Sequence, residues 1–172
     1  MGSTQNMKPQ TVTIIGCNGG MGSFLQQRFK SCRHRIFPCD QPLEENLLSE
    51  AMTESGIILL AIPLEAYEEV LERIGPYIND DSILMDICSV KIKPLEMMLR
   101  HHKGPVIGTH PLFGPEPDNQ TPLRVALTPG RGNDTLQFVH QLLESIELRP
   151  FQTTAQKHDR SLAFIQGLNY VT

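Results

Sequence analysis

The sequence predicts an α/β fold built on a doubly wound, mostly parallel sheet. Apolar, β-branched runs alternate with amphipathic stretches along the whole chain. The runs are apolar on both faces, which is typical of parallel strands covered on both sides by helices. Because crossovers between parallel strands are right-handed, we expect helices on both faces of the sheet.

The first two strands are expected at residues 11–16 and 34–40. Pro38 has no N–H group, so it must lie where the neighbouring strand needs no donor. A helix is expected between these strands, because every fourth residue of one face is apolar: Met21, Leu25 and Phe29.

The third and fourth strands are expected at 56–63 and 82–89, and the third is far too short to cross a bilayer. Between them, residues 64–74 predict a helix with one apolar stripe: Ala66, Val70 and Ile74. A further helix at 93–102 carries Pro94 in its first turn, where proline is tolerated.

The last three strands are expected at 105–111, 124–130 and 147–151. The helix 135–146 joins the last two, and two residues can cap it: Asn133 or Asp134. A final helix at 155–172 begins with capping-box spacing at Thr153 and Gln156. A single helix cannot bury its own apolar side chains, here Leu162, Ile165 and Leu168, so we expect the chain to be a piece of a longer protein.

Composition narrows the class of protein. The chain has 172 residues, 40% of them hydrophobic, and a formal net charge of −4, without the Lys/Arg runs of a nucleic-acid surface. It contains neither a membrane-spanning run nor a signal-peptide core, so a cytoplasmic protein is expected. Four cysteines lack disulfide or zinc-type spacing, so we expect free thiols and no metal site: Cys17, Cys32, Cys39 and Cys88.

The stretch "IIGCNGGMG" (14–22) follows the first strand and opens the first helix. In a dinucleotide-binding unit this turn brings backbone N–H groups and a helix N-terminus against a pyrophosphate. Aligned on its end with G-x-G-x-x-G, the stretch has Gly19 and Gly22 at the second and third positions, with Cys17 at the first. Gly16 supplies the turn if the loop is one residue longer; a purely structural glycine loop is the alternative. The expected cofactor contacts here are Gly16, Cys17, Asn18, Gly19, Gly20, Met21 and Gly22.

Asp40 ends the second strand, about 20 residues after the glycines, where an acid accepts hydrogen bonds from the ribose hydroxyls. Its carboxylate would repel a 2′-phosphate and Gln41 is neutral, so NAD is favoured over NADP. The alternative is a solvated turn residue. Strand, glycine turn, helix and acid together predict a Rossmann-like domain.

The carboxyl ends of the third, fourth and fifth strands are expected to meet the glycine turn in one crevice. They read "AIP", "DICSVK" and "GTHPLFGP". Ile62 and Pro63 then lie beside the cofactor, and Ser89, Lys91 and His110 lie toward its nicotinamide end. An isolated histidine is often a simple surface or core residue, but function gathers at this edge.

At these residues the sequence resembles the prephenate dehydrogenase family. The motifs are "IIGCNGGMG", "AIP", "DICSVK", "GTHPLFG" and "HDRSLAFIQGLN", in that order, from about Thr11 onward. "DICSVK" and "GTHPLFG" are specific, whereas the glycine turn fits many dehydrogenases.

The resemblance implies oxidative decarboxylation of prephenate to 4-hydroxyphenylpyruvate with reduction of NAD. By resemblance, His110 accepts a hydrogen bond from the substrate hydroxyl and assists its deprotonation, which suits an imidazole of near-neutral pKa. Ser89 would contact the same hydroxyl and the nicotinamide. His158 either contacts substrate or merely faces solvent, and Lys91 could bind a helix end or solvent.

The resemblance also implies a domain organisation. We expect a disordered lead at 1–10, a dinucleotide-binding domain at 11–153, and at 154–172 the first helix of a C-terminal helical dimerisation domain. In the family that domain makes a homodimer and supplies an arginine for the substrate carboxylate. This chain stops just inside it, so turnover by these 172 residues alone should be poor or absent.

Three alternatives stay open. Arogenate dehydrogenase runs the same chemistry on the amino counterpart of prephenate, and nothing in these residues separates the two. Another dehydrogenase acting on a small carbonyl or hydroxy acid is more distant. A non-catalytic NAD-binding domain is the third, although a sensor has no need of Ser89 and His110.

Overall fold

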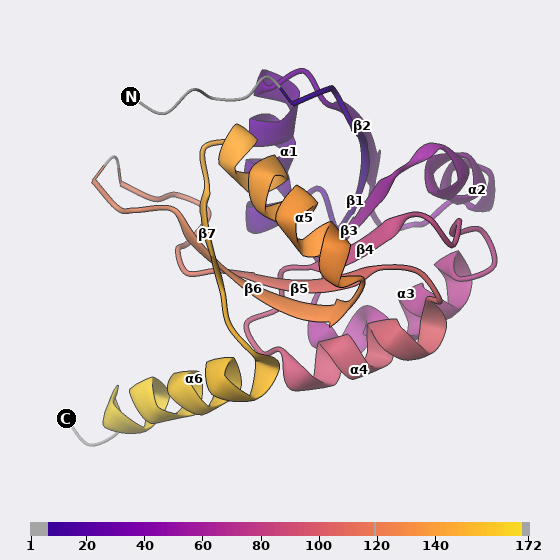
Figure 1. Ribbon diagram of the computed structural model, residues 1–172. Helices are drawn as coiled ribbons and strands as arrows, with labels where there is room; N and C mark the ends of the chain where they lie inside the picture. The colour runs from indigo at the N-terminus through magenta and orange to yellow at the C-terminus, as the bar shows by residue number, and fades with distance from the viewer. Residues whose placement is uncertain (1–6, 119, 170–172) are drawn as a thin grey trace.

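A computed structural model describes residues 7–118 and 120–169 of the chain (Figure 1). Its centre is a seven-stranded sheet of order β2-β1-β3-β4-β5-β6-β7. Only β5 and β6 pair in antiparallel fashion, and every other neighbouring pair is parallel. The predicted mostly parallel sheet is confirmed.

All seven predicted strands are present. They are β1 (Thr11–Ile15), β2 (Arg35–Cys39), β3 (Ile57–Leu60), β4 (Ile83–Asp86), β5 (Val106–Pro111), β6 (Arg124–Arg131) and β7 (Arg149–Gln152). Pro38 lies in β2, at one edge of the sheet, where a missing donor is tolerated.

The helices are α1 (Gly20–Ser31), α2 (Glu45–Glu54), α3 (Tyr67–Ile74), α4 (Ile92–His101), α5 (Asn133–Ser145) and α6 (Ala155–Asn169), with a 3₁₀ turn at Leu64–Ala66 before α3. Helix α2 is not predicted from the sequence. This helix buries Leu48, Ala51 and Met52 and forms the crossover from β2 to β3.

The helices cover both faces of the sheet, as Figure 1 shows. Side chains of α1 and α5 pack into the core on one face, among them Leu25 and Leu142. Side chains of α2, α3 and α4 pack into the core on the other face, among them Leu71 and Met98. The sheet is therefore doubly wound.

Two helix caps differ from the prediction. The N-cap position of α5 is Gly132, in the left-handed region (φ 88°), and the predicted positions 133 and 134 lie inside the helix. For α6 the cap is Thr154, whose Oγ1 accepts a hydrogen bond from the Lys157 N–H. Thr153, the predicted cap, instead donates its N–H to Leu127 and so prolongs the sheet.

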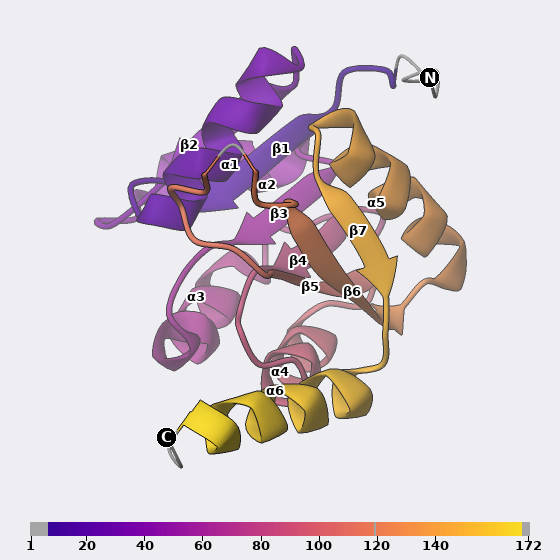
Figure 2. The same ribbon diagram turned by 90° about the vertical axis from the view of Figure 1, so that its left-hand side faces the viewer.

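The two ends of the chain meet the domain differently. Met7 packs against the core, and Gln10 donates its N–H to His34 Nδ1, while residues 1–6 of the predicted lead lie outside the described residues. Helix α6 extends away from the sheet (Figure 2), with Phe164 70% and Ile165 57% exposed. The side chain of Leu168 lies outside the described part. Within residues 7–118 and 120–169, no helix has the length and apolarity to cross a membrane.

Candidate active site

The glycine turn is built around Gly16 and Gly22. Gly16 has a left-handed φ of 87°, and a Cβ on it would lie 2.3 Å from the Ala61 carbonyl oxygen. A Cβ on Gly22 would lie 2.1 Å from the Gly16 carbonyl oxygen. Gly16 therefore supplies the tight turn, and the alignment that put Cys17 there is wrong. The loop is one residue longer than the usual fingerprint, and Cys17 is buried beneath it.

The turn leaves the start of α1 free to bind an anion. Gly19 is the N-cap residue, and no side chain caps the helix. A Cβ on Gly19 would meet only the Gly16 carbonyl oxygen, at 3.4 Å. The first N–H groups of a helix carry a partial positive charge, so this uncapped end fits a pyrophosphate.

Asp40 stands beside this turn, directly after β2. Its Oδ2 accepts a hydrogen bond from the Asn18 N–H at 2.7 Å, and its Oδ1 accepts one from the Gln41 N–H at 2.8 Å. A cavity of about 220 Å³ lies between the turn and the end of β3, and five of the predicted cofactor residues line it: Gly16, Gly19, Asp40, Ile62 and Pro63.

A second feature lies at the same edge, where β4 and β5 separate. Their ladder stops after Met85 and Ile107, although β5 continues to Pro111. The Asp86 side chain then replaces the ladder: its Oδ1 accepts the Thr109 N–H at 3.0 Å. The Thr109 hydroxyl in turn donates to the Asp86 backbone carbonyl.

Lys91 fills the opening between these strands. The prediction that it binds a helix end or solvent is wrong, because its side chain is fully buried. Its Nζ donates to Asp86 Oδ1 at 2.6 Å, to Asp86 Oδ2 at 2.5 Å and to the Thr109 carbonyl at 2.6 Å. The Tyr67 hydroxyl also donates to Asp86, and burial together with that carboxylate raises the pKa of Tyr67 far above its usual value.

His110 lies in β5, one residue before the strand ends, and is half-buried. It therefore occupies the carboxyl edge that also carries the glycine turn. Its Nδ1 lies 3.0 Å from His158 Nε2. Burial, followed by the proximity of His158 and Lys91, lowers the pKa of His110 to about 4. The expectation of a near-neutral pKa is thus wrong: the ring is a neutral hydrogen-bond acceptor around pH 7.

His158 is buried, and α6 brings it to His110 from outside the sheet. Its Nδ1 lies 2.8 Å from Asp159 Oδ1. Both ring nitrogens thus have partners within the protein, and the side chain does not face solvent. Ser89, in the turn between β4 and α4, is exposed.

The segment after β5 runs from the strand end that carries His110 to the glycine turn at the start of α1. Phe113 packs edge-on against Phe24 of α1, with ring centroids 5.5 Å apart. Pro115 reaches the start of α1, where its ring would lie 3.0 Å from a Cβ on Gly20.

Four residues of this site are not predicted from the sequence: Tyr67, Asp86, Thr109 and Asp159. Asp86 carried a signal, because a charged residue ending an otherwise apolar strand needs a buried partner. No comparable signal joins Asp159 to the site. In the described part of the chain, no group of three or more His, Cys, Asp or Glu is arranged to hold a metal ion.

These features define the class. A doubly wound sheet, a glycine turn between β1 and an uncapped helix, and an acid after the neighbouring strand together make a dinucleotide-binding domain of the kind found in dehydrogenases. The sequence model of the prephenate dehydrogenase nucleotide-binding domain matches residues 43–150. The chain belongs to this family.

Individual relatives agree with that assignment. The chain is 32% identical over 162 residues to the T-protein of Enterobacter agglomerans, covering 92% of this chain and 42% of that protein. It is 27% identical to the probable arogenate/prephenate dehydrogenase of Methanocaldococcus jannaschii, covering 93% of this chain and 40% of that protein. The chain thus spans less than half the length of these two relatives.

Among solved structures, the fold is similar to that of prephenate dehydrogenase from A. aeolicus in complex with hydroxyphenyl propionate and NAD+. The TM-score is 0.76 at 18% identity, and the match covers 89% of this chain and 63% of that chain.

Proposed function

We propose that the chain is the NAD-binding part of an NAD-dependent prephenate dehydrogenase, which oxidatively decarboxylates prephenate to 4-hydroxyphenylpyruvate in tyrosine biosynthesis. One observation carries the proposal: the glycine turn with Asp40, and the strand end with His110, share the carboxyl edge of the sheet. Between β1 and β5 lie three strand spacings, about 14 Å, a span that suits the length of a dinucleotide.

The residues at this edge fit NAD. The uncapped start of α1 can hold the pyrophosphate, while Asp40 can exchange a hydrogen bond to the turn for one to a ribose hydroxyl. A carboxylate there disfavours the 2′-phosphate of NADP. When bound there, NAD would supply the acceptor for the hydride that leaves the substrate.

His110 supplies the acceptor for the substrate hydroxyl. A neutral imidazole with a lowered pKa is a weak base, but the hydroxyl becomes strongly acidic as hydride leaves its carbon, so a weak base is enough. Ser89, exposed in the neighbouring turn, can donate or accept a hydrogen bond at the same hydroxyl.

The test is prephenate-dependent NADH formation by the longest natural polypeptide that carries this chain. His110→Asn should lower kcat by about 100-fold or more, the usual effect of losing a general base. His140→Asn is the control, because the His140 side chain is 39% exposed on α5. A His110→Asn protein with full kcat would remove His110 from the mechanism, and a lack of oxidation by the wild type would defeat the proposed activity.

Arogenate is the second candidate substrate, favoured by the name of the Methanocaldococcus jannaschii relative. The two substrates differ in an amino group, and the values of kcat/KM for each decide between them. A polypeptide that binds NAD and oxidises neither substrate would instead favour the non-catalytic alternative.

We also propose a homodimer made through the helical region and a cytoplasmic location. Phe164 and Ile165 on α6 support the dimer, because exposed apolar residues on one helix are typical of an interface. Light scattering of the longest natural polypeptide should give twice the monomer mass, and the matched pair Phe164→Ser and Ile165→Ser should lower it.

A further inference from the structure

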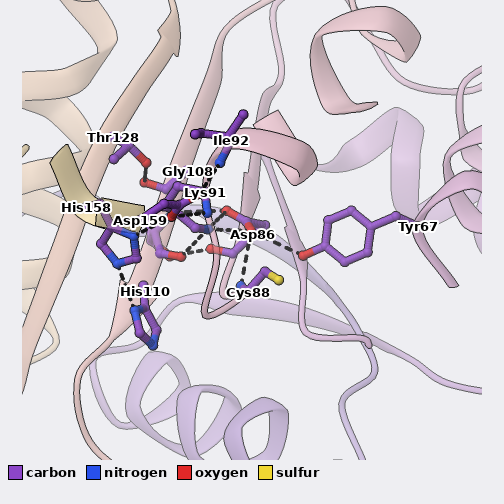
Figure 3. A network of polar contacts seen from close by, with 11 residues as sticks. Tyr67, Asp86, Cys88, Lys91, Ile92, Gly108, His110, Thr128, His158 and Asp159 are labelled. Atoms are coloured by element: carbon purple, nitrogen blue, oxygen red, sulfur yellow. Dashed lines mark hydrogen bonds and ion pairs between the residues drawn. The ribbon is translucent and has the colours of Figure 1, made fainter. Parts of the chain in front are cut away.

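His110, His158 and Asp159 form one hydrogen-bonded chain that ends on α4 (Figure 3). Asp159 also accepts two backbone hydrogen bonds at the start of that helix, from Lys91 N–H to Oδ1 at 2.8 Å and from Ile92 N–H to Oδ2 at 2.9 Å. The carboxylate is therefore held in place by a second element, and His158 is held by the carboxylate.

The protonation states in this hydrogen-bonded network follow from that of Asp159. Burial alone would raise the pKa of Asp159, but the hydrogen bonds from Ile92, His158 and Lys91 outweigh it and lower the pKa. An ionised carboxylate can only accept hydrogen bonds, so His158 Nδ1 carries a proton. In a neutral ring, His158 Nε2 is then a bare acceptor.

The tautomer of His158 determines the tautomer of His110. A bare His158 Nε2 needs a donor, and the atom 3.0 Å away is His110 Nδ1, which must then carry the proton. His110 is neutral, so its own Nε2 is bare. In Figure 3 that nitrogen points away from the network.

We propose that His158 and Asp159 are positioning residues that fix the tautomer of His110, so that its Nε2 lone pair is always available to the substrate hydroxyl. The proposal rests on the proposed function. It assigns to His158 a role through His110 in place of a direct substrate contact. It also ties the reacting imidazole of β5 to α6, an element outside the predicted dinucleotide-binding domain. The charged or titratable groups around His110 are His158 and Asp159 of α6 and Lys91 before α4.

The first test needs no substrate. Nitrogen-15 NMR of histidine-labelled protein distinguishes a protonated ring nitrogen from a bare one, and His110→Asn identifies the His110 signals among the six histidines. The wild type should show protonated Nδ1 and bare Nε2 at His110. His158→Leu should give a mixture of tautomers, whereas His158→Gln should retain the wild-type pattern, because the amide oxygen can accept where Nε2 did.

A bare Nδ1 on His110 in the wild type, or an unchanged pattern in His158→Leu, would overturn the proposal. This measurement stands whether or not the protein oxidises prephenate. A failure of the proposed function is therefore distinguishable from a failure of the proposed relay.

The second test is kinetic and uses the longest natural polypeptide. His158→Leu should lower kcat by about 100-fold with little change in KM, and His158→Gln should recover most of the loss. His140→Leu, at a half-buried position on α5 away from the site, should leave both constants unchanged. A raised KM with unchanged kcat in His158→Leu would indicate a substrate contact and overturn the positioning role. So would a kcat loss that His158→Gln does not recover.

Discussion

At the scale of single residues, the glycines of the first turn are not equivalent. Gly16 and Gly22 meet backbone atoms of the protein itself, and neither site has room for a Cβ. Gly19 has ordinary space inside the protein and faces the cavity beside Asp40. Gly16 and Gly22 therefore serve the folding of the turn, whereas we expect Gly19 to serve the approach of a ligand.

This difference predicts opposite phenotypes. Gly22→Ala should lower the free energy of unfolding by about 1–3 kcal/mol, because the Cβ would lie 2.1 Å from a carbonyl oxygen. Gly19→Ala should change it by less than about 0.5 kcal/mol but weaken NAD binding. Urea denaturation and NAD titration measure the two effects. Gly56→Ala, where a Cβ would meet nothing within 4 Å, should change neither. Equal stability losses at 19 and 22 would contradict this account.

The positions of the candidate site residues could be predicted from the sequence more readily than their environments. The residues of the glycine turn, Asp40 and His110 follow from their order along alternating strands and helices. The lowered pKa of His110 depends on burial and on a side chain that approaches from α6. Neither is encoded in local spacing, so the expected near-neutral imidazole was wrong.

At the scale of elements, the split between β4 and β5 is what opens the edge of the sheet. Two strand ends without a ladder leave backbone groups unpaired, and the buried pair Asp86 and Lys91 satisfies them. The charged pair costs desolvation energy, which its hydrogen bonds offset. The pair therefore keeps β5, which carries His110, apart from the turn after β4, which carries Ser89.

Removing the cation should be costly. Lys91→Met leaves Asp86 buried without its charge partner, so the free energy of unfolding should fall by about 3–5 kcal/mol. Lys93→Met, at an exposed position two residues along, should change it by less than about 0.5 kcal/mol. Urea denaturation of both variants makes the comparison. Similar stabilities for the two would show that the pair is dispensable.

Element prediction failed where local contrast is weak. In α2 the buried stripe contains only Leu48, Ala51 and Met52, while the adjacent Leu47 is 40% exposed and blurs the pattern. No side chain caps its start. The split of β4 from β5 could not be predicted either, because periodicity reports which faces are buried and not where a ladder stops.

At the scale of the whole molecule, buried neutral histidines make the fold sensitive to acid. His34 accepts the Gln10 N–H and His102 lies 2.7 Å from the Ser82 carbonyl, each holding distant segments together. Burial lowers the pKa of both below the ordinary value. Just below the ordinary histidine pKa, the unfolded chain therefore binds protons at these histidines while the folded chain does not.

Stability should be complete above the ordinary histidine pKa of about 6.5 and fall as the pH drops below it. The slope should reach about 1.4 kcal/mol per pH unit for each such histidine. Urea denaturation between about pH 8 and about pH 5 measures it. His34→Asn retains an acceptor for Gln10 without the titration and should flatten the slope, whereas His140→Asn, whose side chain is 39% exposed, should not. A stability that rises on acidification would contradict the assignment.

The architecture as a whole was the most predictable level. Seven strands and a doubly wound sheet follow from alternation and handedness, since these depend on many residues at once and tolerate local errors. The domain boundaries at 10 and 153 stay predictions.

The stretch from His110 to Pro115 has one more consequence. It is anchored at one end in β5 and at the other against Phe24 and Gly20 of the helix start. Because a short segment held at both ends limits relative movement, it sets the distance between His110 and the start of α1. An insertion into this stretch would therefore let that distance vary, although the contacts at both ends stay unchanged.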